Sequence, residues 1–162
     1  MTDDFDEIDR SILAILLREA RTPIAQIAES VGLSRPSVTE RIEKLQRRGA
    51  ICGTTVVLYP PAFGLGVTAF VSARQVGSFD TRGRRVWEEF LRREEIVEAH
   101  SVAGDDCYLL KVRTDSISSL NAIVNELGAD PLGLATRTTI VLETHCEKIG
   151  GITLPRGGDH AS

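Results

Sequence analysis

The feature that most constrains the fold is a very short gap between two helical segments near the N-terminus. The sequence predicts that one helix ends at Gly32 and that Ser34 caps the next, so only two or three residues separate them. The first of these helices has an apolar face of helical period, made of Ile24, Ile27, Ala28 and Val31. Helices joined this closely must turn sharply against each other, so the segment is predicted to form a helix-turn-helix.

An additional helix is predicted before this pair, over residues 6–20. Its apolar residues repeat at helical spacing, and they are Ile8, Ile12, Leu13, Leu16 and Leu17. Acidic residues stand in its first turn, where carboxylates complement the helix dipole. The third helix is predicted from Ser34 to about Arg48, and Gly49 ends it. The first fifty residues are therefore expected to form a three-helix unit.

The third predicted helix carries a stripe of polar and basic side chains beside its buried face. At about 100° per residue, its core positions fall together, and they are Val38, Ile42 and Leu45. Between Ser34 and Arg48 there are five basic and two acidic residues, a local net charge of +3, although the whole chain carries −4. A locally basic helix within an acidic chain is the charge pattern expected of a DNA-recognition helix.

Candidate DNA contacts follow from position along this helix. The N-terminal half usually enters the major groove, and it holds Ser34, Arg35, Ser37 and Arg41. Arg41 is the candidate for a base contact, because its forked donors can bridge guanine acceptors. Lys44, Arg47 and Arg48 are candidates for phosphate contacts, which position a protein without reading sequence. The alternative is an ordinary solvated face on a three-helix bundle.

The remaining chain alternates between strand and helix patterns. After a β-rich stretch over 51–58 and the Pro60-Pro61 break, the predicted strands are 67–76, 96–103, 107–113 and 135–144, and the helices are 82–93 and 116–127. The order βαββαβ is the ferredoxin-like split unit, with one antiparallel sheet and both helices on one face. The uncovered face either meets water or packs against another subunit.

These patterns predict an α+β protein of two domains. A winged helix-turn-helix domain is expected over residues 1–52, and a ferredoxin-like domain for ligand sensing and oligomerisation over 65–148. Residues 53–64 are expected to form a linker strand and hinge between them. The tail over 149–162 has little apolar content, so it is expected to be disordered.

With these elements in place, the sequence resembles the Lrp/AsnC family, the feast/famine regulators of bacteria and archaea. The match runs from about Phe5 to Lys148. In the first unit it is carried by Ile8-Asp9, Ile12-Leu13, Arg21, Val31-Gly32-Leu33-Ser34, and the run from Arg41 through Leu45 to Gly49 and Ile51. This string, followed by a βαββαβ half, is highly specific. The resemblance implies a sequence-specific transcription regulator that binds DNA.

The resemblance also implies that the second half is an amino-acid-binding module that builds the dimer. The family's usual mark is a hairpin of the form V-x-G-x-x-D-Y, which here is the segment 102–108. Gly104 and Tyr108 match this form. Cys107 stands where the family commonly has aspartate, so the usual acidic contact is absent, although two aspartates remain nearby.

An amino-acid ligand would present an ammonium and a carboxylate to this hairpin. Asp105 or Asp106 can accept from the ammonium, and backbone N–H groups can bind the carboxylate where Gly104 leaves the backbone approachable. The resemblance places the pocket between subunits, so that hydroxyls of the final strand can close it. The candidate ligand-binding residues are Val102, Gly104, Asp105, Asp106, Cys107, Thr138 and Thr139. Taken alone, Gly104-Asp105 is also the signal of a plain two-residue hairpin.

No catalytic or metal-binding pattern stands out in the sequence. The three cysteines, Cys52, Cys107 and Cys146, share no close spacing, as a zinc site or disulfide framework would require. The histidines also lack ligand spacing; His100 and His145 fall in predicted strands, and His160 falls in the tail. We therefore predict a protein that is not an enzyme and has no cofactor.

The start of the chain is acidic and polar, and no apolar run is long enough to cross a bilayer. A cytoplasmic protein is therefore predicted, with no membrane contact. Its expected partners are double-stranded DNA, a small effector that the resemblance identifies as an amino acid, and a second copy of the chain. The resemblance further implies assembly of dimers into tetramers or octamers.

Two other functional classes compete with this prediction. A metabolic enzyme built on the ferredoxin-like half is one, and the missing catalytic residues argue against it. The other is an oligomeric ligand-sensing module that regulates a protein partner without DNA. The basic stripe of Arg41, Lys44 and Arg48 argues against this second class.

Overall fold

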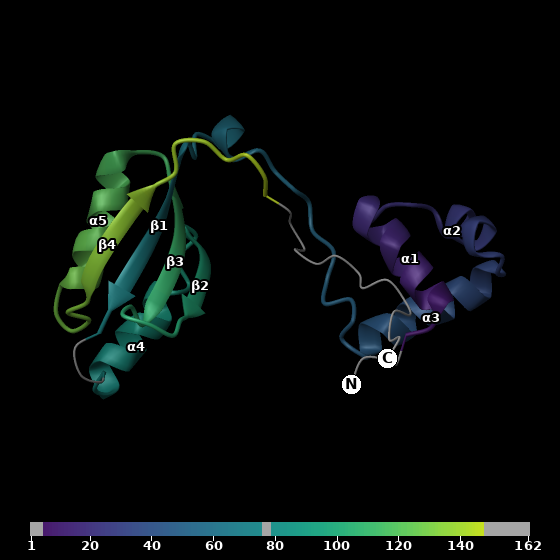
Figure 1. Ribbon diagram of the computed structural model, residues 1–162, viewed down its shortest axis with the longest axis horizontal. Helices are drawn as coiled ribbons and strands as arrows, with labels where there is room; N and C mark the ends of the chain where they lie inside the picture. Colours follow the sequence, from purple (N-terminus) through teal and green to yellow (C-terminus); the bar gives the residue numbers. More distant parts are fainter. Residues whose placement is uncertain (1–4, 76–78, 148–162) are drawn as a thin grey trace, which may run out of the picture. The chain divides into compact units, whose positions relative to one another are not determined.

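The computed structural model describes residues 5–75 and 79–147. The chain divides into two compact units, one within residues 1–57 and the other over residues 58–147 (Figure 1). The first unit contains α1 (Glu7–Arg18), α2 (Ile24–Val31) and α3 (Arg35–Arg47). The second contains a four-stranded sheet and two longer helices. The tail predicted to be disordered begins beyond the described residues.

The three helices of the first unit enclose a small core of their own. Its fully buried members are Ile12, Ile27, Val38 and Leu45. Gly32 ends α2 in the left-handed region at φ 67°, which a glycine adopts without a Cβ clash, and α3 begins three residues later. The Ser34 hydroxyl caps α3 by accepting a hydrogen bond from the Ser37 N–H. The predicted helix-turn-helix is therefore present.

The strand predicted over residues 51–58 does not form, and neither does a wing. Residues 51–59 have no helix or strand, and the short 3₁₀ helix η1 (Pro60–Phe63) follows. Val56 and Tyr59 are 78% and 71% exposed. A strand needs a neighbour for its backbone donors and acceptors, and the described residues supply none here. Apolar, β-branched composition alone was therefore insufficient.

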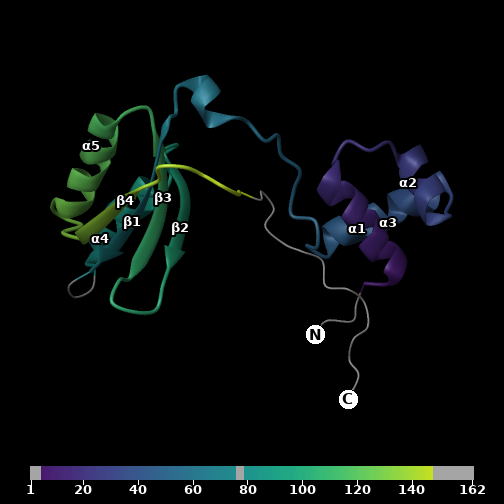
Figure 2. The ribbon, with the colours of Figure 1, turned by 45° about the horizontal axis from the view of Figure 1, so that its top comes forward.

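The second unit has the predicted ferredoxin-like topology. Its strands are β1 (Val67–Arg74), β2 (Ile96–Ser101), β3 (Tyr108–Thr114) and β4 (Ala135–Ile140). They lie in the order β2-β3-β1-β4, and every neighbouring pair is antiparallel. The helices α4 (Thr81–Phe90) and α5 (Ile117–Gly128) complete the βαββαβ order. Figure 2 shows α5 lying along one side of the sheet.

Both helices cover the same face of this sheet. Alternate residues of the two central strands, such as Val71 and Leu110, are fully buried and share one core cluster with Phe90 of α4 and Ile123 of α5. Because side chains alternate across a strand, the residues between them lie on the opposite face. No described helix covers that opposite face, which we call the open face.

The open face is a mixture of apolar and charged side chains. Phe70 of β1 is 39% exposed and pairs across the strands with Lys111 of β3. The Lys111 ammonium contacts the Glu98 carboxylate at 3.2 Å and also Glu147. Arg113 contacts Glu147 at 3.3 Å. The charges at the centre of this face are therefore already paired within the chain.

The hairpin between β2 and β3 is longer than predicted. Ser101 pairs with Tyr108, and the Val102 N–H donates to the Cys107 carbonyl at 3.0 Å, which leaves four residues in the loop. The two-residue turn expected at Gly104-Asp105 is therefore wrong. The final strand also ends earlier than predicted, at Ile140, so His145 lies outside it.

Candidate functional site

The surface of α3 presents the basic residues predicted to meet DNA, but not all of them are available. Ser34, Arg35, Lys44 and Arg47 are exposed, and Ser37 is half-buried beside the Ser34 cap. Arg47 makes one weak pair with Glu43, at 3.5 Å along the helix. An exposed pair of this kind holds its cation loosely. These residues can therefore turn toward a DNA partner.

Arg41 is held inside the unit instead. Its guanidinium donates to Asp6 at 2.7 Å and to Asp9 at 2.6 Å, both on the first turn of α1. Asp9 is only 4% exposed, so its carboxylate depends on this arginine for its charge partner. We call this arrangement the Asp6–Arg41–Asp9 clamp. It disfavours the predicted base contact by Arg41, since the donors are already used.

The clamp shifts the ionisation of its members in the expected directions. The pKa of Asp6 is lowered, first by the hydrogen bond from the Asp9 N–H and then by the Arg41 guanidinium. The pKa of Arg41 is raised, chiefly by its hydrogen bonds to Asp6 and then to Asp9. Both shifts favour the charged forms, as hydrogen bonding between opposite charges does.

Arg48 is also directed toward the start of α1. Its guanidinium lies 5.3 Å from the centre of the Phe5 ring, within the range of a cation–π contact. Two arginines of the predicted DNA-binding stripe therefore contact the N-terminal part of α1. Sequence spacing could not show this, because Asp6 and Arg41 are 35 residues apart.

A pH dependence follows from the lowered pKa of Asp6. A carboxylate with a depressed folded-state pKa contributes stability above its ordinary value of 3.8, and this is lost as the pH falls through the folded pKa. Asp6→Asn keeps the capping oxygen and removes only the charge. The wild-type protein should therefore be more stable than Asp6→Asn at pH 6, and the difference should vanish in strong acid. Amide hydrogen exchange in α1 measures it; a difference independent of pH would contradict this.

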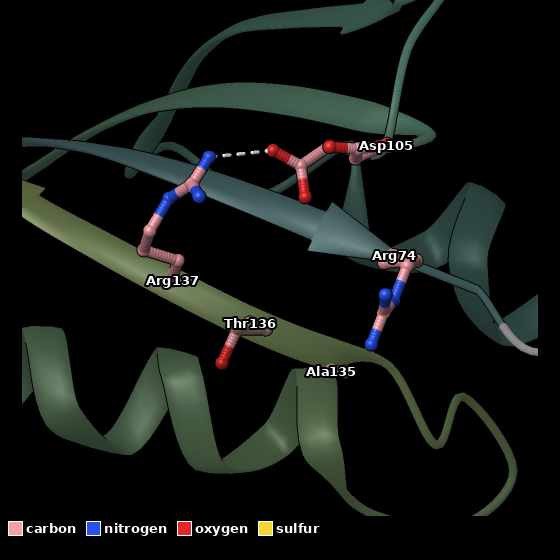
Figure 3. A pocket seen from close by; sticks show the side chains of 6 residues that line it. Arg74, Asp105, Ala135, Thr136 and Arg137 are labelled. Carbon is pink, nitrogen blue, oxygen red and sulfur yellow. Dashed lines mark hydrogen bonds and ion pairs between the residues drawn. The ribbon is translucent and has the colours of Figure 1, made fainter.

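The second candidate site is a shallow pocket at one end of the sheet, of about 290 Å³. Its lining comes from the end of β1, the β2–β3 hairpin loop and the start of β4, and consists of Arg74, Asp105, Asp106, Ala135, Thr136 and Arg137. The Arg137 guanidinium donates to Asp106 at 2.8 Å. Figure 3 shows Arg137 reaching from β4 toward the hairpin loop.

The structure brings together only part of the predicted ligand-binding set. Asp105 and Asp106 line the pocket, in a loop where Gly104 has φ 137°. The Cys107 sulfur instead accepts from the Gln75 N–H at 3.5 Å, and Cys107 does not line the pocket. Val102 is exposed in the hairpin, beside the pocket lining.

Thr138 and Thr139 cannot act together as predicted. Thr139 pairs with Phe70 on the open face, whereas Thr138 pairs with Val71, whose side chain is buried under the helices. Adjacent strand residues point to opposite faces, so only Thr139 shares a face with Arg137. Neither threonine lines the pocket. Two residues earlier in the strand, Thr136 and Arg137 do, and the sequence carried no signal that would have selected them.

Among residues 5–75 and 79–147, no group of three or more histidine, cysteine, aspartate or glutamate side chains is placed to hold a metal ion. All three cysteines are free thiols. No helix formed by the described part of the chain is long and apolar enough to cross a membrane.

Comparison with known proteins decides the family. The model of the AsnC-type helix-turn-helix domain matches residues 5–46, and that of the Lrp/AsnC ligand binding domain matches residues 68–149. The chain belongs to the Lrp/AsnC family. This Lrp/AsnC protein is 33% identical to the HTH-type transcriptional regulator FL11 of Pyrococcus abyssi over 148 residues, covering 91% of this chain and 95% of that one.

Other relatives agree with this assignment. The Leucine-responsive regulatory protein of Escherichia coli K12 is 34% identical over 145 residues, which are 86% of each chain. Among solved structures, the feast or famine regulatory protein of M. tuberculosis complexed with L-methionine has a TM-score of 0.81 at 28% identity, covering 93% of this chain and 99% of that one. This Lrp/AsnC protein is therefore a DNA-binding transcription regulator with an effector-binding domain.

Proposed function

We propose that this Lrp/AsnC protein binds an operator through α3 and that an amino acid, bound at the hairpin pocket, alters this binding. The proposal assigns DNA binding to residues 1–52, a linker to 53–64 and effector binding to 65–148. The observation that carries it is the pair of candidate sites, an exposed basic surface on α3 and a charged pocket in a ligand-binding fold. The protein would act in the cytoplasm by binding alone, without catalysis.

The proposed DNA contacts differ in role from those first predicted. Arg35 takes the base contact, because it stands on the first turn of α3 and is exposed. Ser34 and Ser37 flank it. Lys44 and Arg47 contact phosphates. Arg41 and Arg48 support α3 through α1, since both already contact its N-terminal part.

The open face is the proposed interface with a second copy of the chain. Its central charges are paired within the chain, so a partner can cover them without leaving an isolated buried charge. Phe70 supplies exposed apolar surface there. A symmetric dimer would place two copies of α3 on one DNA duplex, and a ligand near the interface would change their spacing. Further assembly to tetramers or octamers is part of this proposal.

The dimer interface is tested by Phe70→Glu. A charge placed in the middle of the proposed interface should raise the dimer dissociation constant by about 30-fold or more, as for loss of an aromatic contact of ~2 kcal/mol. Analytical ultracentrifugation measures this. Ile117→Glu is the matched control, since Ile117 is 55% exposed on α5, in the helical layer. Equal effects of the two variants would argue against the open face as the interface.

The regulatory function is tested by DNA binding to the promoter fragment upstream of the protein's own gene. Titrations across a salt series, against a scrambled competitor, are made with and without a pool of amino acids. Specific binding that shifts with one amino acid is the expected result. Specific binding that no amino acid changes would retain the DNA function and overturn the effector. Absence of specific binding at this and other promoters would favour a sensing module that regulates a protein partner.

A further inference from the structure

The hairpin pocket contains an unusual arrangement of charges. Arg74 pairs with Ala135, and Arg137 pairs with Ser72, so the two arginines are diagonal neighbours on the open face. Diagonal neighbours across antiparallel strands lie within reach of long side chains, and like charges there repel. Two cations at one corner of a sheet therefore favour the presence of an anion.

Asp106 satisfies only one of these cations. Its carboxylate pairs with Arg137 at 2.8 Å. Among the residues that the structure describes, Arg74 has no ion-pair or hydrogen-bond partner for its side chain, and the same holds for Asp105. The pocket thus offers one unpaired cation and one unpaired anion beside a neutralised pair. This is the charge complement of a zwitterion.

The walls of the pocket also restrict the rest of the ligand. Four of the six lining residues are charged, and the other two are Ala135 and Thr136. No large apolar side chain is among them. An apolar ligand side chain would find little apolar surface to contact and would remove water from charged groups, which is unfavourable. The volume of about 290 Å³ suits a small ligand, because it stands at the lower end of the usual range of ~300–1,000 Å³.

We propose that the effector is an amino acid with a polar side chain, and that Arg74 binds its α-carboxylate while Asp105 binds its α-ammonium. The proposal rests on the effector-binding function proposed above and narrows its ligand class. It sets this chain apart from the M. tuberculosis relative, whose solved complex contains L-methionine. The Arg137–Asp106 pair and the Thr136 hydroxyl would then contact the polar side chain.

The first test measures binding to the full-length protein by calorimetry and by the shift in Tm that a ligand of the native state produces. L-Serine, L-asparagine and L-glutamine are compared with L-leucine and L-methionine at equal concentration. At least one polar amino acid should raise Tm and give a Kd that neither apolar amino acid approaches. Tighter binding of leucine or methionine would overturn the proposal, and so would binding of none of the five.

The second test separates the roles of the two charged residues. For the amino acid that binds best, Arg74→Gln and Asp105→Asn should each weaken binding by about tenfold or more. The methyl ester lacks the carboxylate charge, so Arg74→Gln should no longer distinguish the ester from the free amino acid. Likewise, Asp105→Asn should no longer distinguish the N-acetyl form. A purely structural defect would weaken all ligands alike and retain these preferences, which would overturn the assignment.

Arg84→Gln is the matched control, because Arg84 is an exposed arginine of α4 outside the pocket lining. It should leave binding unchanged, and an equal loss would contradict the role given to Arg74. DNA binding is measured on the same preparations. Specific DNA binding without selectivity for polar amino acids means that this inference fails while the DNA function stands. Loss of specific DNA binding with selectivity intact means the reverse.

Discussion

Replacing Arg41 by alanine is expected to lower the free energy of unfolding of the helix-turn-helix unit by about 3 kcal/mol. The variant leaves the Asp9 carboxylate, which is 4% exposed, without its cation. Breaking a buried pair by removing one partner is costly because the remaining charge is neither solvated nor paired. Amide hydrogen exchange in α1 and α3 measures the change.

Two controls separate this cost from general damage. Asp6→Asn removes a carboxylate whose side chain is 53% exposed, so it should cost less than about 1 kcal/mol. Arg41→Met combined with Asp9→Asn removes both charges of the buried pair and should recover much of the lost stability. Trp87, the single tryptophan, lies in the other unit, so its fluorescence transition should not move. An Arg41→Ala protein as stable as the wild type would contradict the clamp.

The triple variant Arg35→Gln, Lys44→Gln and Arg47→Gln is expected to weaken specific DNA binding about 100-fold or more. Loss of the base contact by Arg35 should also reduce the ratio of specific to non-specific affinity. Two lost phosphate contacts should make the slope of log K against log salt less steep by about 1.8. Titrations of an operator fragment across a salt series measure both effects.

The matched control removes three charges from the other unit, by Arg84→Gln, Arg85→Gln and Arg92→Gln. These arginines are exposed on or just after α4. If they lowered DNA affinity as much as the α3 variant, the loss would reflect net charge rather than contact by α3. The α3 variant should retain its dimer and its effector binding, which shows that the unit remains folded.

Local patterns predicted the elements of both units well. The three helices of the first unit form because their apolar residues repeat with helical period and because Gly32 and Ser34 mark an end and a start. The alternation of strand and helix patterns likewise predicted the ferredoxin-like sheet and the face that the helices leave open. Each of these signals resides within a few neighbouring residues, so the sequence displays it directly.

The errors share one cause. Residues 51–59 have strand-like composition, but a strand forms only with a partner for its backbone, and composition does not name that partner. Thr138 and Thr139 have the right chemistry, but the register of β4 against β1 sends them to opposite faces. In both cases the deciding fact is a pairing between distant segments.

The sequence by itself determined the helix-turn-helix, the βαββαβ order and the family resemblance, because helix caps, turns and apolar periodicity are local properties. Only the tertiary structure decided what the charged residues do. Arg41 meets Asp9 across 32 positions, and Arg137 meets Asp106 across 31. An arginine looks the same in a sequence whether it is free to bind DNA or already paired, since its partner is chosen by the packing of helices and the register of strands.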